Sequence, residues 1–199
     1  MVKRLSFSNQ HLELNDISIH HLDSENSFKL YYRADNEERF ADYTADELSD
    51  ELRARIDELS HTSSLSLLAA LEAVFRIDYL QRNYKKKKDV LSRKFRYIYK
   101  KKSTRASFED DILDAWKEST HGASQLISDL KGVYKYRHWL AHGRYWQPKM
   151  GRQNYDYSSV YELAELTLNS FPFVLKKRLS SKPLLFIHSR TSSALGLSL

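Results

Sequence analysis

The stretch LSLLAALEAVFRIDYL, residues 65–80, is apolar on nearly all sides of a helix, which is the pattern of a helix buried at the centre of a bundle. Three charged residues interrupt it: Glu72, Arg76 and Asp78. Because a buried charge is costly unless it is paired, we expect these three to line a polar seam or to bind one another. The stretch therefore predicts a central helix with a small polar seam.

Helix signals continue on both sides of this stretch. Thr44 and Glu47 have the spacing of a capping box, so the central helix is predicted to begin there and to run to about Asn83. Whether it is interrupted near residues 61–64 stays open. Further helices are predicted over residues 89–102, 107–121, 123–142 and 158–179. Ser107 suits the N-cap of the second of these, and Gly143 suits the C′ position after the third. Pro172 should end or kink the last of them.

The first 43 residues have a different pattern of side chains. Residues 17–19 and 28–32 are rich in β-favouring side chains, and the polar residues 23–27 between them suit a turn. This pattern predicts a small hairpin or an irregular arm. The expected architecture is therefore all-α, a bundle of four or five helices over residues 44–180, with an N-terminal arm (residues 1–43) and a C-terminal tail (residues 181–199).

Composition excludes several classes of protein. The chain has 199 residues and no cysteine, so disulfides and thiolate metal sites are excluded. No apolar run approaches the roughly 20 residues of a membrane span, and the first ten residues lead into no secretory apolar core. We expect a soluble, cytoplasmic protein that does not enter a membrane.

Basic residues are concentrated in one segment. Between Arg82 and Arg105 the chain has 12 basic residues and one acid, whereas residues 1–60 have 7 basic and 14 acidic residues. Such a segment attracts phosphate backbones, although a solvated helix face would have the same composition. Six residues of this segment are expected to contact RNA: Lys85, Lys86, Lys87, Lys88, Arg93 and Lys94. Two residues outside the segment, Arg144 and Tyr145, are also expected to contact RNA.

Arg137, His138 and His142 are the candidate catalytic residues. Arg137 falls near the middle of the apolar stripe of its helix, and His142 flanks that stripe. An arginine there must either pair with a carboxylate, for which Glu72 and Asp78 are the natural choices, or point into a cleft. An arginine suits phosphate, and a histidine can exchange a proton near neutral pH.

A metal site is not expected. His138 and His142 are spaced i, i+4, as in a metal-binding pair on one helix face. Zinc needs a third ligand, however, and Trp139 stands where zincins have glutamate. The sequence therefore predicts no metal ion and no cofactor.

The motif Arg137-His138-x-x-x-His142 resembles the R-x4-H signature of the HEPN superfamily, the higher eukaryotes and prokaryotes nucleotide-binding domains. The wider string YRHWLAHG, residues 136–143, is similar to strings that recur at this helix end in that group. Residues 70–80 look like the helix that precedes the signature. The resemblance spans residues 45–179.

The resemblance implies a helical homodimer with a composite site and a metal-independent endoribonuclease, as in toxins, abortive-infection factors and antiviral defence effectors. By similarity, His142 would be the general base or acid, Arg137 would stabilise the phosphate charge and His138 would orient them or bind phosphate. An antitoxin or another regulatory partner is also implied.

One position departs from the family. HEPN toxins that are paired with a nucleotidyltransferase antitoxin have a modified tyrosine two residues after the histidine, where this chain has Arg144, and Tyr145 follows one residue later. Regulation through a tyrosine at that position is therefore not expected. Two alternatives stay open: a non-catalytic RNA-binding or dimerisation module, and a structural dimer in which Arg137 forms a buried ion pair.

Overall fold

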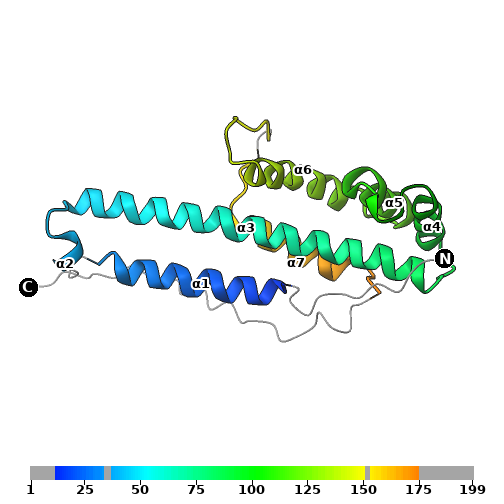
Figure 1. Cartoon of the computed structure of the whole chain (residues 1–199), viewed down its shortest axis with the longest axis horizontal. Helices are drawn as coiled ribbons and strands as arrows, with labels where there is room; N and C mark the ends of the chain where they lie inside the picture. The colour runs from blue at the N-terminus through cyan, green and yellow to red at the C-terminus, as the bar shows by residue number, and fades with distance from the viewer. Residues whose placement is uncertain (1–11, 34–36, 151–152, 175–199) are drawn as a thin grey trace, which may run out of the picture.

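The computed structural model describes residues 12–33, 37–150 and 153–174, and within them every regular element is helical. The 40-residue helix α3 (Ala45–Tyr84) is the central element, along which the other long helices pack (Figure 1). The predicted all-α class is confirmed for these residues.

Helix α3 begins with the predicted capping box. Thr44 Oγ1 accepts from the N–H of Glu47, and the Glu47 carboxylate accepts from the N–H of Thr44 at 2.9 Å. The helix continues without interruption through residues 61–64. The Thr62 hydroxyl donates to the Glu58 carbonyl within the helix, and Ser64 is fully buried. Packing on this face therefore outweighs the modest helix propensity of a Thr-Ser-Ser run.

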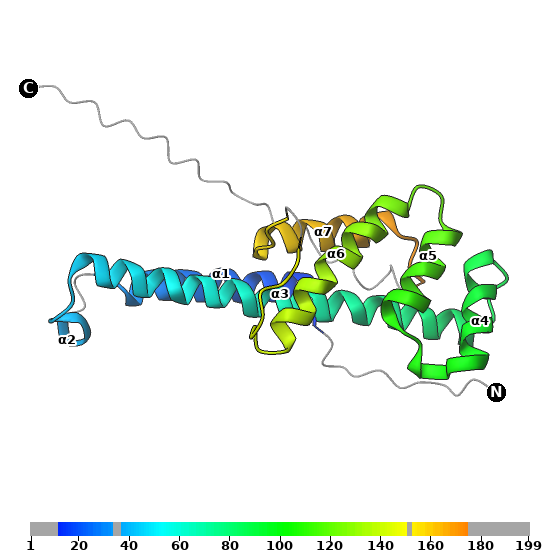
Figure 2. The ribbon, with the colours of Figure 1, turned by 90° about the horizontal axis from the view of Figure 1, so that it is seen from above.

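Helix α1 (Leu14–Tyr31) lies antiparallel to the first half of α3 (Figures 1 and 2). The prediction of a hairpin was wrong, because residues 17–19 and most of residues 28–32 lie in this helix. The helical conformation places Ile17, Ser18 and His21 on one buried face. Packing against α3 thus overrides a weak β preference.

Two shorter helices lie at the C-terminal end of α3. Helix α4 (Val90–Lys102) agrees with the helix predicted over residues 89–102 and is capped by Asp89, whose carboxylate accepts from the N–H of Ser92 at 3.0 Å. Ser107 caps the next segment, as predicted, but that segment starts with a π-helical stretch, Phe108–Leu113, before helix α5 (Asp114–Ser119). A four-residue helix, α2 (Glu37–Phe40), lies at the opposite end of α3 (Figure 1).

Helices α6 (Ser124–Ala141) and α7 (Tyr157–Ser170) complete the described bundle. Helix α7 ends earlier than residue 179 because Phe171, which precedes Pro172, adopts an extended conformation. The predicted tail, residues 181–199, lies outside the described residues.

The core is centred on Phe75 of α3. Its ring meets those of Trp116, Phe171 and Phe173 edge to face, with centroids 6.1, 5.8 and 5.0 Å away. Such pairs add to the free energy gained by burying the rings. Helix α6 is fixed to α3 by Tyr134, whose hydroxyl donates to the Leu68 carbonyl at 2.7 Å. This contact sets the position of the helix that carries the candidate motif.

Candidate functional site

Helix α6 ends in a Schellman motif that exposes the predicted motif. Gly143 and Arg144 both have positive φ, +78° and +58°. The N–H of Arg144 donates to the Trp139 carbonyl at 3.2 Å, and the N–H of Gly143 donates to the Leu140 carbonyl at 3.5 Å. These bonds satisfy two carbonyls that the helix end would otherwise leave free. Gly143 therefore takes the C′ position that the sequence predicts.

His138 and His142 form an adjacent pair at this end of α6. Their ring centroids are 4.3 Å apart with the ring planes inclined by 53°. Both side chains are exposed. Within the described part of the chain, neither imidazole has a hydrogen bond or an ion pair. Two unengaged imidazoles side by side can accept one proton and donate another.

Trp146 and Tyr145 border the histidine pair. The Trp146 ring lies 5.7 Å from that of His138 and 6.5 Å from that of His142. Its carbonyl accepts from Trp139 Nε1 at 2.7 Å, which fixes the loop against α6. Tyr145 packs edge-on against Trp146 and is 84% exposed, so its ring is available for stacking on an unpaired base.

Arg137 lies on another side of α6 and pairs with Glu72 of α3. Its Nη2 is 3.4 Å from Glu72 Oε2, while Arg76 Nε donates to Glu72 Oε1 at 2.6 Å. The Arg137 side chain is 35% exposed, and its buried Nε has no partner among the described residues. Arg137 is therefore held by a carboxylate through its terminal nitrogen, while its buried Nε–H has no partner among the described residues.

Asp78 belongs to a different cluster from Glu72. It accepts from Arg82 Nε at 2.6 Å and from the N–H of Val174 at 2.7 Å. Burial raises the pKa of the Asp78 carboxyl, and the charge of Arg82 opposes that shift. The polar seam predicted from Glu72, Arg76 and Asp78 is thus divided: the first two join Arg137, and the third ties α3 to the chain after α7.

The structure does not join Arg137 to His142 within one chain. The two residues are separated by about 140° around the helix and about 7.5 Å along it. Between them the described residues show no hydrogen bond or ion pair. His142 instead has His138 as its neighbour, so one chain presents an imidazole pair on one surface and an arginine–glutamate pair on another.

Arg144 is less free than the sequence suggests. Its Nη1 lies 2.7 Å from Glu58 Oε2 and 2.8 Å from His61 Nδ1, both on α3. Burial and the neighbouring Arg144 charge lower the pKa of His61, which favours the neutral ring that can accept this hydrogen bond. Arg144 thus anchors the turn after α6 to α3.

The basic residues lie far from the histidine pair. Lys85, Lys86, Lys87 and Lys88 are exposed in the turn after α3, and Arg93 is exposed on α4. Lys94 forms an ion pair with Glu118. Helix α3 rises about 39 Å between Glu58, which holds the turn after α6, and Tyr84. The predicted RNA contacts therefore fall on two separate surfaces.

Sequence reasoning missed Glu58, His61 and Trp146. Glu58 and His61 are remote from the motif in sequence, and only the packing of α6 on α3 brings them to it. Trp146 belongs to no motif, and a tryptophan is most simply expected in a core or an interface. The sequence indicates that Trp146 lies near the histidine pair only through its position, four residues after His142 and just beyond the glycine that ends the helix.

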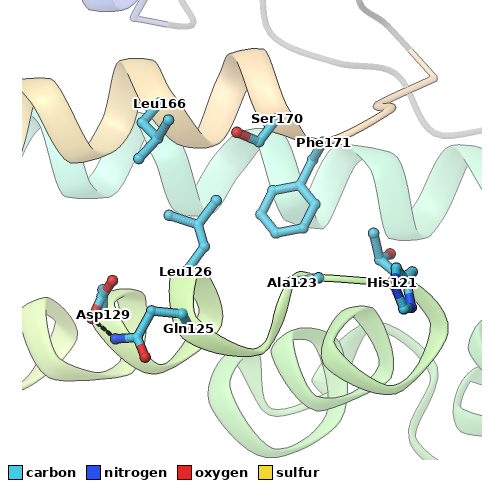
Figure 3. A pocket seen from close by; sticks show the side chains of 10 residues that line it. His121, Ala123, Gln125, Leu126, Asp129, Leu166, Ser170 and Phe171 are labelled. Carbon is cyan, nitrogen blue, oxygen red and sulfur yellow. Dashed lines mark hydrogen bonds between the residues drawn. The ribbon is translucent and has the colours of Figure 1, made fainter.

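A cavity in the described part of the structure lies away from the histidine pair. It has a volume of about 340 Å³ and is bounded by the start of α6 and the end of α7, including Leu126 and Phe171 (Figure 3). His121 lies at its edge, and Gln125 donates to Asp129 along one wall. None of the predicted site residues lines it, so it gives no support to a site at the motif.

Comparison with known proteins identifies no relative: no family model, no curated protein and no solved structure matches the chain. Among the described helices, none combines the length and the apolar character that a membrane crossing requires. Within the same residues, no three His, Asp or Glu side chains are grouped as ligands for one metal ion.

Proposed function

We propose that this protein is an endoribonuclease of HEPN type that cleaves RNA without a metal ion. His142 and His138 are its acid–base pair, and Arg137 meets the charge on the phosphate. The observation that carries the proposal is the pair of exposed, unengaged imidazoles with centroids 4.3 Å apart, at the end of the helix that bears the motif. General acid–base catalysis by such a pair needs no metal.

The proposed reaction is an internal transfer at phosphorus. One imidazole takes the proton of the ribose 2′-OH as that oxygen attacks the adjacent phosphorus. The other gives a proton to the 5′ oxygen as the bond from phosphorus to that oxygen breaks. The products are a 2′,3′-cyclic phosphate and a 5′-OH, and the two imidazoles end with their protonation states exchanged.

Arg137 enters this scheme from a second copy of the chain. Because Arg137 and His142 lie on different sides of α6, a composite site at a dimer interface is the arrangement that lets both reach one phosphate. The Arg137 side chain is 35% exposed, which supports this role, since a guanidinium that is partly open to solvent can meet a phosphate oxygen. Such an enzyme suits a toxin or another defence effector.

A second candidate function is an RNA-binding module without catalysis. The separate basic turn, Lys85–Lys88, favours it, because that surface can hold a phosphate backbone without any help from the histidine pair. The two candidates differ in whether RNA is cut, not in whether it is bound.

The decisive experiment is a cleavage assay on total RNA and tRNA in the presence of EDTA. We expect the wild type to leave cyclic phosphate ends, and His142→Ala and His138→Ala each to lower the rate by about 10²–10⁴-fold. His121→Ala, at an exposed histidine remote from the motif, is the matched control and should cleave normally. Cleavage that survives the double His138→Ala, His142→Ala change would overturn the proposal, and binding without cleavage would favour the second candidate.

A further inference from the structure

We propose that His138 and His142 together chelate a divalent transition metal ion of the kind that prefers imidazole, with Zn²⁺ as the representative. The sequence argues against a zinc centre with three protein ligands, whereas the proposed site has only two. It is a two-ligand chelate at the surface, and it follows from where the helix end places the two rings.

The geometry of the pair is close to that of a chelate. Zinc binds an imidazole nitrogen at about 2.0–2.1 Å, so two rings on one tetrahedral ion have centroids about 5 Å apart. The observed separation is 4.3 Å. Both side chains are exposed, so rotation about their side-chain bonds can supply the difference.

Nothing in the described surroundings competes for the imidazole nitrogens. Neither ring has a hydrogen bond or an ion pair in the described part of the chain. The two arginines nearest in sequence, Arg137 and Arg144, are each paired with a carboxylate, which reduces their repulsion of a cation. The rings also lie at the C-terminal end of α6, where the helix dipole favours positive charge.

Two protein ligands make the site exchangeable rather than structural. Since the described residues offer no third ligand, water completes the coordination sphere. Imidazole selects zinc, copper and nickel, whereas magnesium prefers oxygen ligands. We therefore expect reversible binding of Zn²⁺ and no binding of Mg²⁺ at this pair.

Metal binding at this pair would switch off the proposed enzyme. A bound ion occupies the nitrogen lone pair that a general base needs, so zinc should inhibit RNA cleavage and EDTA should restore it. This consequence rests on the proposed ribonuclease activity, whereas binding of the ion does not.

Isothermal titration of the full chain with Zn²⁺ tests the inference. We expect one binding event that His138→Ala or His142→Ala weakens by about tenfold or more and that Mg²⁺ does not reproduce. His121→Ala should bind zinc like the wild type. Thermal melting without metal shows whether each variant is folded, and folding should not depend on exposed rings.

The outcomes separate this inference from the proposed function. Zinc affinity that is unchanged in the folded double His138→Ala, His142→Ala variant would overturn the metal site, even if the wild type cleaves RNA. Zinc binding that depends on the pair, in a protein that never cleaves RNA, would uphold the site and refute the ribonuclease.

Discussion

Arg137 reaches from α6 to α3, where its Nη2 lies 3.4 Å from Glu72 Oε2, an oxygen of the carboxylate that also accepts from Arg76. Glu72 therefore has two roles. It links two helices through their arginines, and it competes with any phosphate for the guanidinium of Arg137. Glu72 is only 16% exposed, so its charge is little screened by water.

Glu72→Gln should separate these roles. The change keeps the size of the side chain and removes its charge, so we expect the free energy of unfolding to fall by about 1.5–3 kcal/mol, the usual contribution of a hydrogen bond to a charged group. RNA should bind more tightly because Arg137 is released. Urea unfolding and an RNA titration measure the two effects.

Asp114→Asn is the matched control for that change. Its carboxylate pairs with Lys131 at 2.8 Å but is 40% exposed, so its loss should cost less than about 1 kcal/mol. Equal stability losses in the two variants, with unchanged RNA affinity in both, would contradict the role assigned to Glu72.

Gly143→Ala should damage the histidine pair through the backbone. Gly143 has φ +78° and no atom within 4 Å of an added Cβ, so the penalty is conformational strain of about 1–2 kcal/mol rather than a clash. The turn should then shift the rings of His138 and His142. Zinc titration and the cleavage assay should both report the change.

Gly122 offers a control for that strain. Its φ is +75° and its surroundings are equally open, but it lies at the other end of α6. Gly122→Ala should lower stability by a similar amount and leave zinc binding and cleavage intact. A Gly143→Ala protein that binds zinc like Gly122→Ala would show that the turn does not position the pair.

The basic turn, Lys85–Lys88, should contribute to RNA affinity only when the RNA is long. Replacing Lys85–Lys88 with glutamine should weaken binding and reduce the slope of log K against log salt by about 0.7 for each lost phosphate contact. Tyr84, next to this turn, lies about 39 Å along α3 from Glu58, the partner of Arg144. A stacked RNA strand, at about 3.4 Å per nucleotide, needs more than about ten nucleotides to span that length.

Binding of a six-nucleotide and a thirty-nucleotide RNA at several salt concentrations checks this expectation. A variant with Lys29, Arg53, Arg55 and Lys117 replaced by glutamine removes the same number of exposed charges outside the turn and is the control for net charge. Equal losses for both RNA lengths would mean that the basic turn and the histidine pair form one surface.

The sequence was sufficient for features that depend on local chemistry. The capping box at Thr44, the cap at Ser107 and the terminal Gly143 each satisfy backbone groups within a few residues, so their spacing alone identifies them. The apolar stretch over residues 65–80 likewise marked the central helix, since α3 is surrounded on that half.

Features that depend on tertiary packing were not predictable. The β-favouring residues 17–19 became helical because α3 offers them a surface on which to pack. Glu72 and Asp78 were equal as partners of Arg137 until α6 was placed against α3, and only then did Glu72 prove to be the partner. The neighbours of Arg144, Glu58 and His61, are more than eighty residues away in sequence, where no spacing rule applies.

His21 should make stability fall as the pH is lowered. Its Nδ1 lies 2.9 Å from Ser63 Oγ, and its ring stacks on Tyr157 with centroids 3.6 Å apart. Burial lowers the pKa of His21, an effect opposed by Glu25 and reinforced by His20. The unfolded chain therefore binds the proton more readily, so the folded state loses stability as the pH falls through the ordinary histidine range.

Comparing wild type with His21→Gln isolates this effect. We expect the loss of stability between about pH 7.5 and about pH 5.5, measured by urea unfolding, to be smaller in the variant. The raised pKa of Asp78 has the opposite effect on stability, because it favours the folded state as the pH falls. Asp78 is present in both proteins, so its effect cancels in the comparison. Identical pH slopes would show that the contact between α1, α3 and α7 tolerates a charged ring.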